Sequence, residues 1–159
     1  FAENNISPRV IFFSMNEDDV RHALKQPWVS VGSDGSAPSA KMRAENTAVH
    51  PRAYGTFPRV LGHYARDEKL FPLEEAVRKM TSQAALRAHI FDRGVLRPGM
   101  KADILIFDPE KVRDVSTFED PHHFSVGIDD VIVNGVPVLR GGKLTGALPG
   151  RTIRGKGHS

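Results

Sequence analysis

The chain has 159 residues, of which 40% are hydrophobic and 26% are charged, and its formal net charge is +3. This balance is typical of a globular protein with one ordinary core, and it excludes a disordered or fibrous chain. The sequence has no cysteine, which excludes disulfides and thiolate metal sites. A reducing compartment fits this composition, so we expect a cytoplasmic protein.

The membrane and nucleic acids are not expected as partners. No apolar stretch is long enough to span a bilayer, and no secretory signal pattern opens the chain. Basic residues are scattered, and only the tail after residue 150 is locally basic. The chain begins at Phe1 rather than at methionine, which suggests a processed or truncated product or an incomplete reading frame.

The first elements predict a βαβ unit. Residues 9–14 (RVIFFS) form a short apolar run typical of a buried strand. A helix follows over residues 17–25, with Asn16 as its N-cap, and residues 28–33 (WVSVGS) predict a second strand. Two strands joined by a helix are parallel, with a right-handed crossover.

Helices are then expected to dominate up to about residue 91. Residues 35–55 show no clear periodicity and predict a long loop. Apolar residues at helical spacing predict helices over residues 56–68 and 72–80, and a further turn or two over residues 82–90.

The character of the chain changes after about residue 92. Residues 102–107 form a continuous apolar strand, and Asn134-Gly135 suits a type I′ turn between two apolar runs. Pro137 places the second of these runs at an edge or a bulge, and Gly141-Gly142 supply another turn. The pattern predicts two architectural pieces, residues 1–91 and 92–159.

Asp34 is the first candidate for chemistry. It follows the predicted strand 28–33 between Gly32 and Gly35, and catalytic groups collect past the carboxyl ends of parallel strands. The alternative is an ordinary Asp-Gly turn, which is very common. Sequence spacing alone leaves both interpretations open.

His50 and Arg52 stand on either side of Pro51, just before a predicted helix. A guanidinium at this place is able to clamp a carboxylate through two hydrogen bonds. The alternative is an arginine that caps carbonyl groups or pairs with nearby acidic residues.

The histidines do not form a recognisable metal motif. The chain has no H-x-H and no H-E-x-x-H, and adjacent histidines on a strand would face opposite ways. Most are better interpreted as surface or loop residues; the seven are His22, His50, His63, His89, His122, His123 and His158.

Several stretches together resemble one family in order and spacing, the N-acyl-D-amino-acid deacylases of the amidohydrolase superfamily. These stretches are VGSDG, HPRAYGTFPRVLG, LEEAVRKMTS, RGVLRPGMKADILIFD and the segment VIVNGVPV with the following TGALPGRTIRG. The resemblance is to the carboxyl-terminal part of that family. It implies an α/β fold: the last β/α units of a (β/α)8 metal-dependent hydrolase barrel in residues 1–91, followed by strands of a small β-sandwich in residues 92–159.

The resemblance also implies a site. Asp34 matches the aspartate that takes a proton from metal-bound water and delivers it to the leaving amine, and it is a candidate metal ligand in the full-length site. Arg52 matches the group that binds the substrate α-carboxylate, and Tyr54 and His50 are expected to line the same mouth. The cofactor is one or two divalent metals, usually zinc, and the substrate is an N-acyl-D-amino acid.

The departures from the family pattern are equally specific. The family's metal-binding histidines lie in earlier barrel strands, which this sequence does not contain, so we expect this chain alone to hold no zinc and to be inactive. The loop from residue 35 to 49 also looks longer than in the family, which leaves the specificity pocket open. Two alternatives remain: a cyclic-amide hydrolase of the same superfamily, such as a hydantoinase or dihydroorotase, and a non-catalytic folded fragment, with or without homo-oligomerisation.

Overall fold

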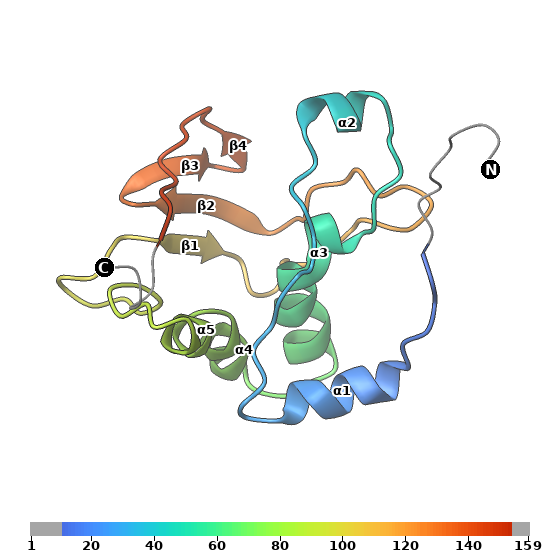
Figure 1. The fold of residues 1–159 in the computed structure, drawn as a ribbon, viewed down its shortest axis with the longest axis horizontal. Coiled ribbons are helices and arrows are strands. Elements are labelled where there is room, and N and C mark those ends of the chain that lie inside the picture. The colour runs from blue at the N-terminus through green and yellow to red at the C-terminus, as the bar shows by residue number, and fades with distance from the viewer. Residues whose placement is uncertain (1–10, 154–159) are drawn as a thin grey trace.

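The fold, seen in a computed structural model that describes residues 11–153, places helices before a small antiparallel sheet (Figure 1). The helical elements are α1 (Glu17–Lys25), α2 (Ala40–Ala44), α3 (Arg52–Arg59), the π-helix η2 (Val60–Asp67), α4 (Leu73–Met80) and α5 (Ser82–Arg87). The strands are β1 (Ile104–Phe107), β2 (Ile128–Val133), β3 (Val136–Arg140) and β4 (Lys143–Leu144). Within the described residues, helices therefore end at residue 87 and strands begin at residue 104.

Local sequence explains where the first helices begin. The side chain of Asn16 accepts a hydrogen bond from the Asp18 amide at 2.8 Å, which confirms it as the N-cap of α1. Ser39 caps α2 in the same way through the amide of Met42. Among residues 11–153, no helix combines the length and the hydropathy that crossing a membrane requires.

The helix predicted over residues 56–68 is present but begins earlier and changes its winding. Pro51 precedes the first helical residue, Arg52, and its fixed φ of −51° suits a helix start. The α-helical part ends at Arg59, and a π-helix continues over Val60–Asp67. The helix α2 and the start of α3 both fall inside residues 35–55, which were predicted to be a loop. The sequence does not reveal α2, because a helix of five residues is too short to show a helical period.

The four strands form one antiparallel sheet in the order β1-β2-β3-β4. Asn134 and Gly135 join β2 to β3 with φ values of 50° and 80°, so the predicted type I′ hairpin is confirmed. The register of this pair shifts between Val131 and Ile132, opposite Pro137, which confirms the predicted irregularity.

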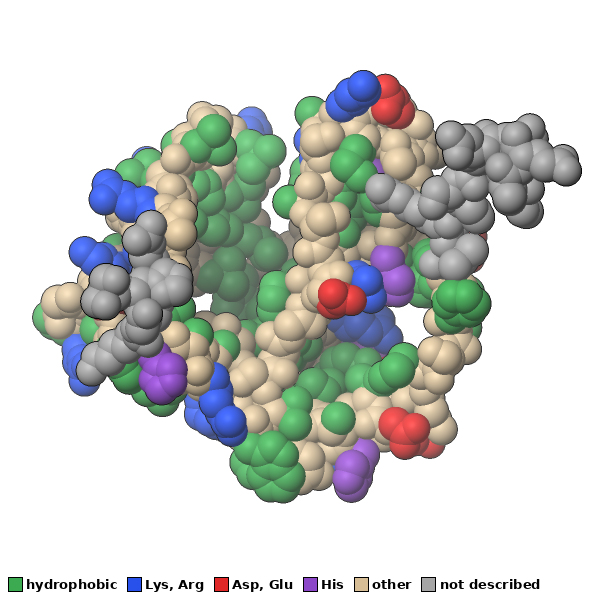
Figure 2. Space-filling model, viewed as in Figure 1, with side chains coloured by type: hydrophobic (Ala, Val, Ile, Leu, Met, Phe, Trp, Pro, Cys, Tyr) green, Lys and Arg blue, Asp and Glu red, His purple; other side chains and the backbone are tan. Residues whose placement is uncertain are grey.

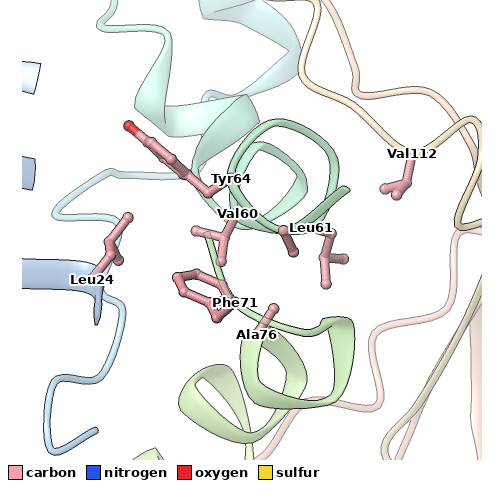
Figure 3. Close-up of a cluster of buried hydrophobic side chains, with 8 residues drawn as sticks. Leu24, Val60, Leu61, Tyr64, Phe71, Ala76 and Val112 are labelled. Carbon is pink, nitrogen blue, oxygen red and sulfur yellow. The ribbon is translucent and has the colours of Figure 1, made fainter. Parts of the chain in front are cut away.

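The core lies between the helices and a residue of the long connection between β1 and β2. Figure 3 shows Val60 and Phe71 at its centre, with Leu24 of α1 on one side and Val112 on the other. Val112 is fully buried, so the β1–β2 connection contributes to the same core as the helices. The sheet meets this core through partly buried residues of its first two strands.

The two strands predicted at residues 9–14 and 28–33 are wrong for the described residues. Residues 11–16 and 29–33 have no regular secondary structure, and Trp28 lies in a turn. None of them pairs with another segment in the described part of the chain, and residues 9 and 10 lie outside it. A parallel strand requires a lateral partner, and such a partner is not encoded in the strand itself.

The segment that leads to Asp34 is held by side chains instead of a strand ladder. Lys79 of α4 is 1% exposed, and its Nζ donates hydrogen bonds to the carbonyl oxygens of Gln26 and Val29. Gln83 of α5 donates to the hydroxyl of Ser30 at 3.1 Å. Hydrogen bonds from buried side chains restrict the position of their partners, so α4 and α5 hold residues 26–30 in place. The chain continues from this segment to Asp34, which meets α3.

Candidate functional site

Asp34 follows the irregular segment 29–33, in a backbone conformation that few residues adopt. Its φ is 46°, in the left-handed region that aspartate tolerates better than most side chains. The side chain is 88% exposed. The carboxylate is therefore accessible to a molecule that enters from solvent.

Arg52, the first residue of α3, reaches this carboxylate. Its Nη2 lies 3.0 Å from Oδ2 of Asp34. Gly35 makes the approach possible, because a Cβ at this position would lie 3.1 Å from the Cα of Ala53 in the same helix. The structure thus brings together the two residues that the sequence placed 18 positions apart.

His50 stands beside Arg52 and is tied to it through the backbone. Its Nδ1 accepts a hydrogen bond from the backbone amide of Arg52 at 3.1 Å, which places the proton of the neutral ring on Nε2. The edge of the ring packs on Phe118, with ring centroids 5.0 Å apart. Burial and the neighbouring Arg52 charge lower the pKa of His50 below its ordinary value of 6.5.

These three residues share the wall of one pocket of about 590 Å³. On the face drawn in Figure 2, hydrophobic side chains appear in several patches, with single acidic, basic and histidine side chains between them. The pocket has the mixed lining that small-molecule sites usually show. Its lining residues are Ile11, Phe12, Ser14, Met15, Asp34, Gly35, Ser36, Ala48, Val49, His50, Arg52 and Ala53.

Tyr54, the fourth residue expected at this mouth, is not among the residues that line the pocket. Its hydroxyl instead hydrogen-bonds to Nδ1 of His122 at 2.8 Å. The other ring nitrogen of His122, Nε2, is 2.7 Å from the carbonyl oxygen of Thr47. The sequence predicts His122 to be a surface or loop residue, because no motif or spacing links it to positions about 70 residues earlier.

The donor side chains decide whether the described residues are able to hold a metal ion. Within residues 11–153, no group of three or more His, Cys, Asp or Glu side chains is arranged to hold a metal ion. The pocket wall offers one carboxylate, from Asp34, and one imidazole, from His50. The described residues do not by themselves form a zinc site.

Comparison with known proteins gives consistent relatives. Residues 8–139 match the amidohydrolase family. The chain is 46% identical over 143 residues to D-aminoacylase from Alcaligenes xylosoxydans xylosoxydans, covering 90% of this chain and 28% of that protein. It is 38% identical to N-acyl-D-aspartate deacylase of the same organism, over 90% of this chain and 27% of that protein.

Solved structures agree with the sequence relatives. A D-aminoacylase variant in complex with copper chloride is 43% identical, with a TM-score of 0.81 over 90% of this chain and 29% of that one. An N-acyl-D-glutamate deacylase from Bordetella bronchiseptica, complexed with zinc and a phosphonate inhibitor, is 43% identical, with a TM-score of 0.71 over 79% of this chain and 25% of that one.

A further D-aminoacylase structure, described for the role of its binuclear metal centre, is 44% identical, with a TM-score of 0.77 over 86% of this chain and 27% of that one. The present chain therefore spans about a quarter of the length of the relatives that it matches. The family match covers most of the chain, and the solved relatives share its fold at more than 40% identity. This chain belongs to the amidohydrolase family.

Proposed function

We propose that the whole protein hydrolyses the amide bond of N-acyl-D-amino acids, with Asp34 transferring the proton and Arg52 binding the substrate α-carboxylate. The observation that carries this proposal is the pairing of the two side chains, 3.0 Å apart, on the wall of one pocket. Curated relatives named for D-amino-acid substrates support the substrate class.

The proton balance of the reaction suits a single carboxylate. Hydrolysis forms a bond between the water oxygen and the carbonyl carbon and breaks the bond from that carbon to nitrogen. The water loses a proton and the departing nitrogen gains one, so one exposed carboxylate beside the scissile bond is able to take the first and return it as the second. Asp34 has the required exposure.

The ion pair between Asp34 and Arg52 is compatible with this role because it is cheap to separate. Both side chains are substantially exposed, 88% and 43%, and such pairs contribute less than about 1 kcal/mol. A substrate carboxylate that takes up Arg52 then leaves Asp34 free to accept a proton. In this proposal, the binding of the substrate carboxylate to Arg52 is also the step that separates Asp34 from Arg52.

The same proposal includes the division of the chain into two parts. Residues 1–91 would supply the last β/α units of a (β/α)8 barrel and residues 92–159 strands of a small β-sandwich. The separation of the helices, which end at residue 87, from the strands, which begin at residue 104, supports this division.

The test is a substrate panel measured on the whole protein. We expect hydrolysis of N-acetyl-D-amino acids, much slower hydrolysis of their L-isomers, and no hydrolysis of hydantoins, which lack the free carboxylate that Arg52 would bind. A preference for hydantoins would instead support the cyclic-amide alternative.

Asp34→Asn in the whole protein is expected to lower kcat by about 100- to 10,000-fold, the usual contribution of a general acid or base. Metal content, measured by elemental analysis, separates the two roles: it stays unchanged if Asp34 only transfers the proton, and it falls if Asp34 is also a metal ligand. Asp120→Asn is the matched control, because Asp120 is an exposed aspartate whose side chain pairs with His123, away from the pocket. Substantial activity remaining in Asp34→Asn rejects the proton-transfer role.

A further inference from the structure

One imidazole links both flanks of the segment that carries the candidate site. His122 contacts Thr47 and Tyr54, and residues 47–54 include His50 and Arg52. The two hydrogen bonds measure 2.7 and 2.8 Å, and the ring is partly buried. His122 comes from the connection between β1 and β2, about 70 positions later in the chain.

The chemistry of the partners fixes the direction of both hydrogen bonds. The Thr47 carbonyl oxygen only accepts, so Nε2 of His122 donates to it. In the neutral ring, Nδ1 is then an acceptor, and the hydroxyl of Tyr54 donates to it. Every polar atom of the imidazole is used, so the ring has one preferred orientation.

Neighbouring contacts hold His122 against the same segment. The hydroxyl of Ser125 donates to the backbone carbonyl of Tyr54 at 3.0 Å. The ring of Phe124 packs edge-on against Tyr54, with centroids 5.8 Å apart. His122, Phe124 and Ser125 therefore all contact Tyr54, in the first turn of α3.

We propose that His122 is a positioning residue that fixes residues 47–54 and thereby places Arg52 opposite Asp34. His122 is not among the residues that line the pocket, so it acts through this segment and not on the substrate. The catalytic consequence rests on the proposed function of Arg52, whereas the mechanical consequence does not. Asp34 lies on a separate segment, residues 28–34, whereas the hydrogen bonds and the ring contact of His122 in the described chain are to Thr47 and Tyr54.

The kinetic test compares adjacent histidines in the whole protein. His122→Phe keeps an aromatic ring and removes both hydrogen bonds, so KM for an N-acetyl-D-amino acid should rise about 5- to 20-fold, while kcat changes less than about 2-fold. His122→Gln retains one donor and one acceptor and should restore most of the loss.

His123→Phe is the matched control, because this exposed neighbour pairs with Asp120 outside the pocket. Its KM should equal that of the unchanged protein. An equal effect of His122→Phe and His123→Phe, or a loss confined to kcat, overturns the positioning role.

Hydrogen exchange separates this inference from the proposed function. In His122→Phe, the amides of residues 47–54 should exchange about 5-fold faster or more, as expected when one or two hydrogen bonds of about 1 kcal/mol each are lost. Exchange in α4, residues 73–80, should not change. Unaltered exchange in residues 47–54 overturns the inference even if the enzyme is a deacylase, whereas faster exchange without any hydrolysis of N-acyl-D-amino acids rejects only the proposed function.

Discussion

Asp34 and Arg52 face each other because of two local features of the backbone. Asp34 occupies a left-handed conformation at φ 46°, and Gly35 next to it allows the chain to touch α3 at Ala53. Pro51 starts that helix at Arg52, whose side chain then reaches back to the turn. Each feature is visible in the sequence as a residue type, but only their combination defines a site.

His50 provides a pH-dependent prediction at the same scale. Burial and the Arg52 charge lower its pKa, so the folded protein favours the neutral ring, whose Nδ1 accepts the Arg52 amide. The stability that this preference contributes is present above the unfolded pKa of about 6.5 and is lost as the pH falls through the lowered value. An NMR titration of His50 in the whole protein should give a pKa below 6.5.

The cause of the shift is tested by removing one contributor. Arg52→Met should raise the pKa of His50 towards 6.5 without reaching it, because burial remains. Arg87→Met, at an exposed arginine of α5 outside the pocket, should leave it unchanged. A pKa of His50 above 6.5 in the unchanged protein would contradict the described environment.

The candidate site was only partly predictable from the sequence. Asp34, His50 and Arg52 were predicted and share one pocket wall. Their roles in catalysis and substrate binding stay predictions, as does a substrate contact by Tyr54, whose hydroxyl is bonded to His122. His122 could not have been found, because its partners are distant in sequence and a hydrogen bond between such positions leaves no periodic pattern.

At the scale of elements, η2 packs tightly on the connection between β1 and β2. A Cβ at Gly62 would overlap the carbonyl oxygen of Val112, a residue that is fully buried in the core. Arg66 of η2 donates to the same carbonyl at 2.8 Å. The helical layer and the β segment are therefore locked together at this glycine.

Gly62→Ala is expected to destabilise the whole protein by about 1–3 kcal/mol, because overpacking forces the backbone of one element to move. The sign is informative, since alanine has the better helical propensity and would stabilise an open helix. Gly32→Ala is the control, because a Cβ there meets no atom within 4 Å. Urea unfolding measures both, and a Gly62→Ala variant as stable as Gly32→Ala would contradict the packing.

Elements set by local signals were predicted well, and those set by distant partners were not. The caps and acidic first turn identified α1, and the Asn134-Gly135 pair identified the hairpin. Residues 28–33 were expected to be a strand, yet in the described chain they are fixed by Lys79 and Gln83. Strand pairing is a property of two segments together, and the residues of each segment alone do not show whether the two pair.

At the scale of the whole molecule, large apolar side chains are exposed to solvent at positions where the sequence predicts buried strands. Phe12 and Phe13 are 81% and 79% exposed, and Trp28 is 63% exposed. The chain also spans about a quarter of its curated relatives. The activity, the substrate and any partner are therefore proposed for the whole protein, and they have to be measured on the whole protein.

The most direct test of the central claim compares a substrate with and without the group that Arg52 is proposed to bind. We predict that the whole protein hydrolyses N-acetyl-D-leucine with a kcat/KM about 10- to 150-fold above that of the corresponding carboxamide, as expected for one charge-assisted hydrogen-bonded contact. In Arg52→Met this ratio should fall towards 1, and in Arg87→Met it should not change. A ratio that survives in Arg52→Met would contradict the account.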